Sequence, residues 1–215
     1  MMHILITGGN RGLGRSMVHA ALGLGWKVTA TTRGAPVPEG AETRIVDMSD
    51  LASVARLGDG LAPVDIVINN AGIIGPDRQS TLDMDFTGFA QTLAVNTLAP
   101  LAVVQAVLPA LAPGARILSI SSQMAWMGYA KSDRIAYRAS KAALNKVMQG
   151  LATDLAGRGI TVALVDPGWV RTDMGGADAD LAPEAVAQGI VQLATRLTLA
   201  DTGHFFRHDG TRRAF

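Results

Sequence analysis

Residues 4–14 read Ile-Leu-Ile-Thr-Gly-Gly-Asn-Arg-Gly-Leu-Gly, and apolar residues recur at helical spacing over residues 17–22. This order predicts a strand, a glycine turn and a helix. Gly8 suits a tight turn, Gly12 lets the main chain approach a pyrophosphate, and Gly14 lets the helix pack closely on the strand. The N-terminus of such a helix offers free N–H groups to phosphates. The stretch therefore predicts a dinucleotide site, with a flexible glycine loop as the alternative.

Strands and helices alternate along the rest of the chain. Further strands are predicted near residues 27–33, 43–46, 64–68, 116–120, 161–165 and 204–206, and helices near 50–57, 86–98, 101–111, 133–157 and 183–197. A loop from Gly34 to Ala41 replaces the helix expected between the second and third strands. The alternation predicts an α/β protein in which residues 1–215 form a single-domain Rossmann fold, a doubly wound parallel sheet of about seven strands.

Composition limits the classes of function. A chain of 215 residues with 48% hydrophobic content suits one domain with a large core. The 19 basic and 18 acidic side chains nearly cancel, so nucleic acid is not an expected partner. The chain has no cysteine, begins without a signal-peptide apolar region, and has prolines within its most apolar segment, residues 98–112. We therefore expect a soluble, cytoplasmic protein without a membrane partner. No metal is expected, because the histidines do not share ligand spacing: His3, His19, His204 and His208.

The end of the second predicted strand carries no acid. NAD-binding proteins usually place Asp or Glu there against the ribose 2′-hydroxyl. Thr32 occupies that position, Arg33 follows it, and Arg11 lies in the glycine turn. Because two cations without a carboxylate would accommodate a 2′-phosphate, NADP(H) is the expected cofactor, with NAD(H) as the alternative. A pair of solvated arginines would leave the same pattern.

Polar residues follow the strands predicted at 64–68 and 116–120. They read Asn69-Asn70-Ala71-Gly72 and Ser121-Ser122. Ligands of open α/β sheets lie outside these carboxyl ends, so the amides and hydroxyls are candidates for ligand contact. They could also be ordinary turn formers. Asn96 lies within an apolar helical pattern and needs a buried partner or a water.

Tyr137 and Lys141 stand four residues apart in a long predicted helix. This spacing places both on one helix face, with about 5–6 Å between Cβ atoms. A nearby ammonium favours phenolate and lowers the pKa of a tyrosine, which makes the pair a candidate acid. Many surface helices carry the same pair without any catalytic role. A cap on Ser132 or Asp133 is expected to begin the helix, and a glycine at residue 157 or 159 to end it.

Six motifs occur in one order: Thr7-x-x-x-Arg11-Gly12-x-Gly14, Asn69-Asn70-Ala71-Gly72, Asn96, Ser122, Tyr137-x-x-x-Lys141 and Pro167-Gly168. In this order they resemble the short-chain dehydrogenase/reductase family over essentially the whole chain. Residues 136–145 and 167–176 are similar to its sniffer-like and C-factor-like carbonyl reductase branch. The resemblance implies hydride transfer between a nicotinamide and a small carbonyl or alcohol substrate.

The resemblance also implies roles for single residues. Tyr137 would be the general acid in carbonyl reduction, and Ser122 would hydrogen-bond the developing alkoxide. Lys141 would lower the pKa of the tyrosine and hold the nicotinamide ribose, while Asn96 would anchor a water linking Lys141 to solvent. The implied cofactor-binding residues are Gly8, Asn10, Arg11, Gly12, Leu13, Gly14, Thr32, Arg33, Asp47, Met48, Asn69, Ala71, Gly72, Lys141, Pro167, Gly168, Val170 and Thr172. The implied substrate pocket is Ser122, Trp126, Trp169 and Met174.

Two features depart from the family pattern: the missing helix after Arg33 and the short segment 173–183, where the family usually carries a longer substrate lid. An open, apolar site is expected to accept bulky aromatic carbonyls and to discriminate weakly among them. Family members often pair through the helices at 101–111 and around Tyr137, so a homodimer or homotetramer is expected. The alternative is a signalling or partner-contact protein of the C-factor type with little catalytic role.

Overall fold

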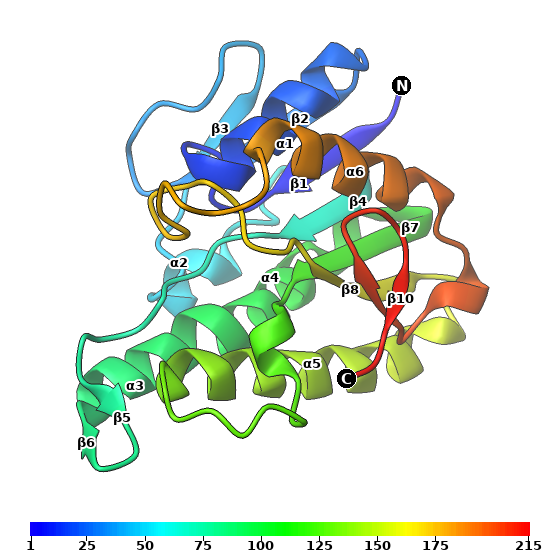
Figure 1. The fold of residues 1–215 in the computed structure, drawn as a ribbon. Helices are drawn as coiled ribbons and strands as arrows, with labels where there is room; N and C mark the ends of the chain where they lie inside the picture. The colour runs from blue at the N-terminus through cyan, green and yellow to red at the C-terminus, as the bar shows by residue number, and fades with distance from the viewer.

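The centre of the protein is an eight-stranded sheet, shown in Figure 1 in a computed structural model that describes residues 1–215. Its strands are β1 (His3–Ile6), β2 (Lys27–Thr32), β3 (Glu42–Ile45), β4 (Val64–Asn69), β7 (Leu111–Ile120), β8 (Thr161–Asp166), β9 (Phe205–Arg207) and β10 (Arg212–Arg213). They lie in the order β10-β9-β8-β7-β4-β1-β2-β3, and only β10 is antiparallel. The predicted parallel sheet is confirmed, with β10 as an unpredicted addition. A separate hairpin, β5 (Gln79–Ser80) and β6 (Asp83–Met84), was also not predicted.

Helices cover both faces of the sheet. They are α1 (Gly12–Gly23), α2 (Leu51–Ala55), α3 (Phe86–Leu93), α4 (Ala99–Val107), α5 (Ile135–Ala156) and α6 (Pro183–Arg196), with a π-helical turn at Ala94–Leu98 and 3-10 turns at Leu108–Ala110, Gln123–Ala125 and Leu199–Asp201. Figure 1 shows α1 and α6 side by side on one face, and α2, α4 and α5 on the other. The fold is therefore a three-layer α/β arrangement, as the alternation predicts.

Alternation along β1 explains how one strand serves two cores. Ile4 and Ile6 pack under α1 and α6, while Leu5 packs with α4 and α5 on the other face. Successive side chains of a strand point to opposite faces, so a strand covered on both sides is apolar at every position. The loop at residues 34–41 contributes Val37 and Ala41 to the first of these cores, in place of a crossover helix.

Two predicted element boundaries were wrong. The helix predicted over residues 101–111 runs from Ala99 to Val107, and β7 starts at Leu111 instead of residue 116. Pro109, in the 3-10 turn after α4, cannot donate the N–H that a continued helix needs.

The helix that carries Tyr137 begins without the predicted Ser132 or Asp133 cap. Arg134, at φ 51°, precedes its first residue. Asp133 pairs instead with the Arg138 guanidinium at 2.9 Å, so its carboxylate is used elsewhere.

The helical run Phe86–Ala110 is long and apolar enough, by length and composition, to cross a membrane. This run begins earlier than residues 98–112, the segment that is most apolar in the sequence. Its middle carries Asn96 and Thr97, which are buried and hydrogen-bonded to other elements, and Val103 and Val104 lie in the core. These contacts are those of a core helix.

Candidate active site

The glycine turn between β1 and α1 forms a cradle at the carboxyl edge of the sheet. Gly8 and Gly12 have φ angles of 70° and 50°, which favour glycine. A Cβ atom on Gly14 would lie 2.1 Å from the Gly8 carbonyl oxygen, so only glycine lets α1 approach the turn this closely. Helix α1 begins at Gly12 without a side-chain cap, so its first N–H groups have no capping acceptor. The turn fits the pyrophosphate of a dinucleotide.

Thr7 ties this turn to the segment that follows β4. Its Oγ1 accepts hydrogen bonds from the N–H groups of Asn70 and Ala71, at 2.9 and 3.0 Å. The Asn70 side chain donates in return to the carbonyl oxygens of Thr7 and Gly8. Because the strand order reverses between β1 and β4, this is the switch point at which open α/β sheets bind their ligands.

Two of the predicted amides are internal cross-links. Asn69 turns into the fold, where its Nδ2 lies 3.2 Å from Ser119 Oγ. The Asn96 side chain accepts from the Ile73 N–H at 2.8 Å and donates to the Ile73 carbonyl at 2.8 Å and to Ser140 Oγ at 3.0 Å. The buried partners predicted for Asn96 are therefore confirmed. Its predicted water, which would connect Lys141 to solvent, stays a prediction.

Ser122, Tyr137 and Lys141 meet where β7 ends against α5. Tyr137 and Lys141 are 8% and 4% exposed, and the Lys141 ammonium lies 5.7 Å from the centre of the Tyr137 ring. Lys141 Nζ donates to the Ile120 carbonyl at 2.7 Å, which fixes the lysine beside the end of β7. The structure thus brings three of the four predicted catalytic side chains together.

Burial dominates the electrostatics of this group. Burial raises the pKa of Tyr137 to about 12, with the Ser122 hydroxyl offsetting part of the rise. Burial lowers the pKa of Lys141 to about 8. Desolvation of the phenolate is the largest effect on the pKa of Tyr137, and the lowering expected from Lys141 stays a prediction. Tyr137 therefore holds a proton at neutral pH, as an acid must.

The segment predicted at the nicotinamide, residues 167–172, closes one side of the crevice. Gly168 has φ 77°, and a Cβ atom there would lie 2.6 Å from the Leu181 side chain. Val170 pairs with Leu181 and is buried. Thr172 lies against Gly12, where a Cβ atom would be 3.4 Å from the Thr172 methyl group. The segment and the glycine turn therefore share one crevice.

The residues predicted to lie at the adenine follow the ends of β2 and β3. Thr32 Oγ1 donates to the Ala35 carbonyl at 2.8 Å and accepts from the Gly34 N–H, so it shapes the turn after β2. Hydrogen bonds from Ser49, with a smaller contribution from the Arg33 charge, hold the pKa of Asp47 below its usual value. The remaining predicted residues at this carboxyl edge are Asn10, Leu13, Met48, Gly72 and Pro167.

The two arginines predicted at the 2′-phosphate differ in their surroundings. Arg33 is exposed and takes part in no ion pair. Arg11 pairs with Asp173 at 3.5 Å, and both side chains are largely exposed. The ion pair joins the glycine turn to the segment predicted over the substrate.

The predicted substrate residues lie at the surface. Trp126, Trp169 and Met174 are 39%, 47% and 42% exposed. The partner of Trp126 is Tyr129, in an edge-to-face contact with ring centres 4.9 Å apart, while the Trp169 indole donates to the Gly175 carbonyl at 2.7 Å. The structure does not stack the two tryptophans on each other.

Three residues near the site were not predicted. Gln79, from β5, accepts a hydrogen bond from the Tyr137 main-chain N–H at 3.2 Å. Asp166, at the end of β8, is 3% exposed and forms an ion pair with Arg213 of β10. Arg213 lies far from the six motifs in sequence. Only the Asp166-Pro167-Gly168 run at the end of β8 could have indicated that Asp166 belongs to the site.

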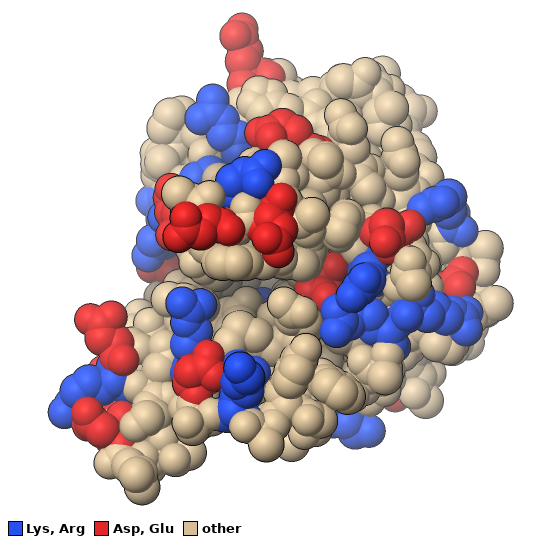
Figure 2. Space-filling view, in the orientation of Figure 1, with Lys and Arg blue, Asp and Glu red and all other residues tan.

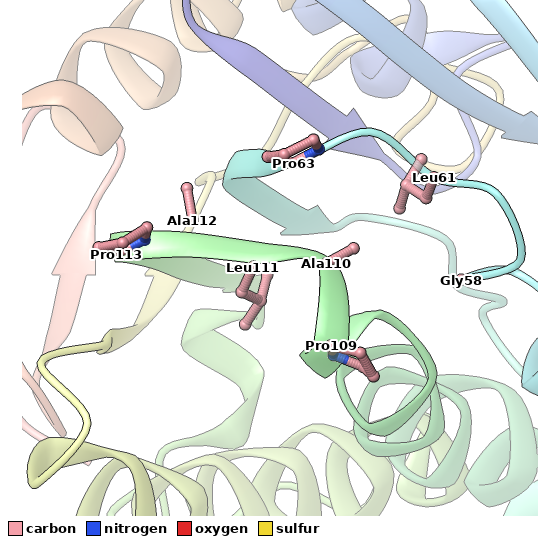
Figure 3. A pocket seen from close by; sticks show the side chains of 8 residues that line it. All are labelled: Gly58, Leu61, Pro63, Pro109, Ala110, Leu111, Ala112 and Pro113. Carbon is pink, nitrogen blue, oxygen red and sulfur yellow. The ribbon is translucent and has the colours of Figure 1, made fainter.

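A cavity of about 370 Å³ lies away from these residues, between the loop before β4 and the start of β7 (Figure 3). It is lined by Gly58, Leu61, Pro63, Pro109, Ala110, Leu111, Ala112 and Pro113. None of these side chains is titratable or nucleophilic, so the cavity offers no catalytic chemistry.

Known proteins share both the sequence and the fold. The family model for short chain dehydrogenases matches residues 2–181. C-signal of Myxococcus xanthus is 42% identical over 154 residues, which span 69% of this chain and 91% of that protein. The structure of carbonyl reductase Sniffer of D. melanogaster superimposes with a TM-score of 0.91 at 29% identity, covering 100% of both chains. A short-chain dehydrogenase/reductase from Burkholderia multivorans with bound NADP gives a TM-score of 0.88 at 28% identity, covering 100% of this chain and 99% of that one.

Proposed function

Because this chain belongs to the short-chain dehydrogenase/reductase family and is an NAD(P)-dependent oxidoreductase, we propose that it is an NADPH-dependent carbonyl reductase with Tyr137 as its general acid. The observation that carries the proposal is the group that Ser122 forms with the buried Tyr137 and Lys141. Burying the Lys141 ammonium costs folding free energy, because burial disfavours the charged form of the amine. A lysine kept at such a position is typical of a functional site. The NADP-bound and Sniffer structures support the choice of cofactor and reaction class.

The chain's own residues supply position and protons. NADPH, when bound, supplies the hydride that reaches the carbonyl carbon. Ser122 donates a hydrogen bond to the carbonyl oxygen as negative charge develops there. Tyr137 then transfers its phenolic proton to that oxygen, which gives the alcohol and leaves a phenolate. The Lys141 ammonium stabilises the phenolate until a proton from solvent restores the phenol.

The residues present fit NADPH. The uncapped start of α1 would hold the pyrophosphate, and Arg33 the 2′-phosphate. Residues 167–172, at the opposite side of the crevice, would lie beside the nicotinamide. Lys141 would hold the nicotinamide ribose.

The test is NADPH consumption with a panel of aldehydes, ketones and quinones. Tyr137→Phe should lower kcat by about 10²–10⁴-fold, because only the proton donor is removed, and should leave NADPH affinity nearly intact. Lys141→Met should damage both kcat and NADPH affinity. Full activity in Tyr137→Phe would show that another group is the acid. We expect bulky aromatic carbonyls among the substrates, since Trp126 and Trp169 leave an open, apolar entrance.

A second candidate is a signalling or partner-contact protein, since one relative bears the name C-signal. The buried Tyr137 and Lys141 favour the enzyme, because a binding module needs neither side chain. A wild-type protein that binds NADPH but consumes none with any carbonyl would favour this second candidate.

We also propose a homodimer or homotetramer in the cytoplasm, associated through α4 and α5. Both helices carry apolar side chains that are only partly buried in the single chain, among them Leu101 and Val147. Light scattering on the purified protein measures the mass directly, and a monomer would exclude this assembly.

A further inference from the structure

The hairpin of β9 and β10 places an arginine beneath the candidate active site. Strand β9 pairs with β8 so that Arg207 lies opposite Asp166, and β10 returns antiparallel with Arg213 opposite Phe205. The Arg213 guanidinium thereby reaches the second carboxylate oxygen of Asp166. Figure 2 shows basic side chains gathered on this side of the molecule. Arg207 and Arg212 of the hairpin are exposed, whereas the Arg213 side chain is 17% exposed.

The other carboxylate oxygen of Asp166 joins two loops of the site. It accepts hydrogen bonds from the N–H of Gln123 at 3.1 Å and from the N–H of Gly168 at 3.0 Å. Gln123 directly follows Ser122 at the end of β7, and Gly168 belongs to the segment assigned to the nicotinamide. A single oxygen atom therefore sets the distance between the hydroxyl that contacts the substrate and the segment beside the cofactor.

Stability alone does not account for an ion pair here. Buried ion pairs contribute little net stability, because desolvation offsets the attraction. An asparagine could accept the same two N–H bonds without any charge. The hairpin is already attached by the His208 N–H, which donates to the Asp166 carbonyl at 3.0 Å.

We propose that Asp166 and Arg213 are a positioning pair, in which Arg213 holds the Asp166 carboxylate so that Ser122 and the Pro167-Gly168 turn keep their relative placement. The inference rests on the proposed function, since Ser122 and this turn are assigned to substrate and nicotinamide there. The charged groups around Tyr137 are consistent with it. Lys141 and Arg134 approach from α5 and its start, and Asp166 from β8, where Arg213 neutralises the one negative charge that opposes formation of phenolate.

Three variants distinguish a positioning role of the ion pair from a merely stabilising one: Arg213→Met, Asp166→Asn and the double variant. Arg213→Met leaves a buried carboxylate without its counter-charge, so the two loops should shift and kcat for carbonyl reduction should fall about tenfold or more. In the double variant the amide oxygen introduced by Asp166→Asn still accepts both N–H bonds and no charge is stranded, so kcat should return to within about threefold of wild type. Arg212→Met is the matched control, because Arg212 pairs with Asp201 at the surface, and it should leave kcat unchanged.

Amide hydrogen exchange gives a readout that does not depend on turnover. The Gln123 and Gly168 N–H groups should lose protection in Arg213→Met and regain it in the double variant. If the wild type reduces no carbonyl, the proposed function fails, and the exchange pattern still decides whether the pair holds the two loops. A kcat and an exchange pattern in Arg213→Met equal to those of Arg212→Met would overturn the inference. A folded double variant that is as slow as Arg213→Met would do the same, because Arg213 would not act through Asp166.

Discussion

The Gln79 side chain accepts a hydrogen bond from the Tyr137 main-chain N–H at 3.2 Å, so a distant hairpin caps the helix that carries the proposed acid. Arg134, the residue before α5, provides no side-chain cap. Gln79 also donates to the carbonyl oxygens of Ile74 and Pro76, at 3.1 and 2.7 Å. The first turn of α5 is therefore held from the segment that follows β4.

Loss of this cap should affect both stability and catalysis. Gln79→Leu leaves the buried N–H of Tyr137 and two partly buried carbonyl groups without this partner, so the free energy of unfolding should fall by about 1–3 kcal/mol. Because Tyr137 lies in the released turn, kcat should fall as well. Gln79→Glu keeps the acceptor for Tyr137 but sets a carboxylate against two carbonyl oxygens, and should be intermediate. Urea unfolding and NADPH turnover measure the effects, with the exposed neighbour Ser80→Ala as control. Equal values for Gln79→Leu and Ser80→Ala would contradict the capping role.

Much of the site could be predicted because its residues lie in local motifs. The glycine turn, the Tyr137 and Lys141 spacing and the polar residues at strand ends each depend on a few neighbouring residues and on the period of one element. The uncommon polar position of Asn96 within an apolar helix indicated buried partners, and the structure provides them in Ile73 and Ser140.

The unpredicted parts depend on contacts between distant segments. Gln79 meets Tyr137 across 58 residues, and Asp166 meets Arg213 across 47. Strand β10 has only two residues, which is too short for an alternating pattern to predict it. The raised pKa of Tyr137 results mainly from its burial in the folded chain, which no local sequence pattern reveals.

The pH dependence of the proposed reaction follows from Lys141. Burial lowers the pKa of this amine to about 8, so its positive charge is lost as the pH rises through that value. Without the charge, phenolate formation at Tyr137 is disfavoured, and kcat/KM for NADPH in carbonyl reduction should fall above about pH 8. The pKa of Tyr137, raised to about 12, should produce no inflection below pH 10. A rate profile that is flat from pH 6 to 10 would exclude this role for Lys141.

Lys141 should also lower the stability of the free protein at neutral pH. Between about pH 8 and the ordinary value of 10.5, the unfolded chain holds a proton on this amine that the folded chain lacks, so stability rises with pH in this window. The difference corresponds to about 3 kcal/mol that burial of the charge costs below pH 8. Lys141→Met removes this cost and loses one hydrogen bond to Ile120, so it should be about 1–2 kcal/mol more stable than wild type at pH 7.

That advantage should disappear by about pH 10. Urea unfolding at pH 7 and pH 10 compares Lys141→Met with the exposed control Lys146→Met, which should show no such change between the two pH values. A stability difference between wild type and Lys141→Met that is the same at both pH values would mean that the folded chain does not depress the pKa of the lysine.

The expected preference for NADPH over NADH depends on two arginines, of which only one forms an ion pair. Arg33 is exposed and in no ion pair, whereas Arg11 is paired with Asp173 at 3.5 Å. Thr32 occupies the position at the end of β2 where NAD-binding proteins usually carry an acid, so no carboxylate there would repel a 2′-phosphate. Charge-assisted hydrogen bonds from one or both arginines, each worth about 1.5–3 kcal/mol before solvent screening, should make NADPH bind about tenfold to a thousandfold more tightly than NADH. The preference should shrink as salt rises, because the contacts lie at the surface.

Fluorescence titration of both reduced cofactors at low and moderate salt tests this assignment. Arg33→Asp should reverse much of the preference, since it removes a cation and places an acid near the ribose, while the exposed Arg56→Asp should preserve it. Asp173→Asn releases Arg11 from its ion pair and should strengthen NADPH binding by a few-fold at most, because exposed ion pairs are worth only about 0–1 kcal/mol. Equal affinities for the two cofactors in the wild type would exclude phosphate recognition. An unchanged preference in Arg33→Asp, together with tighter NADPH binding in Asp173→Asn, would assign the phosphate to Arg11, whose release from Asp173 would then accompany cofactor entry.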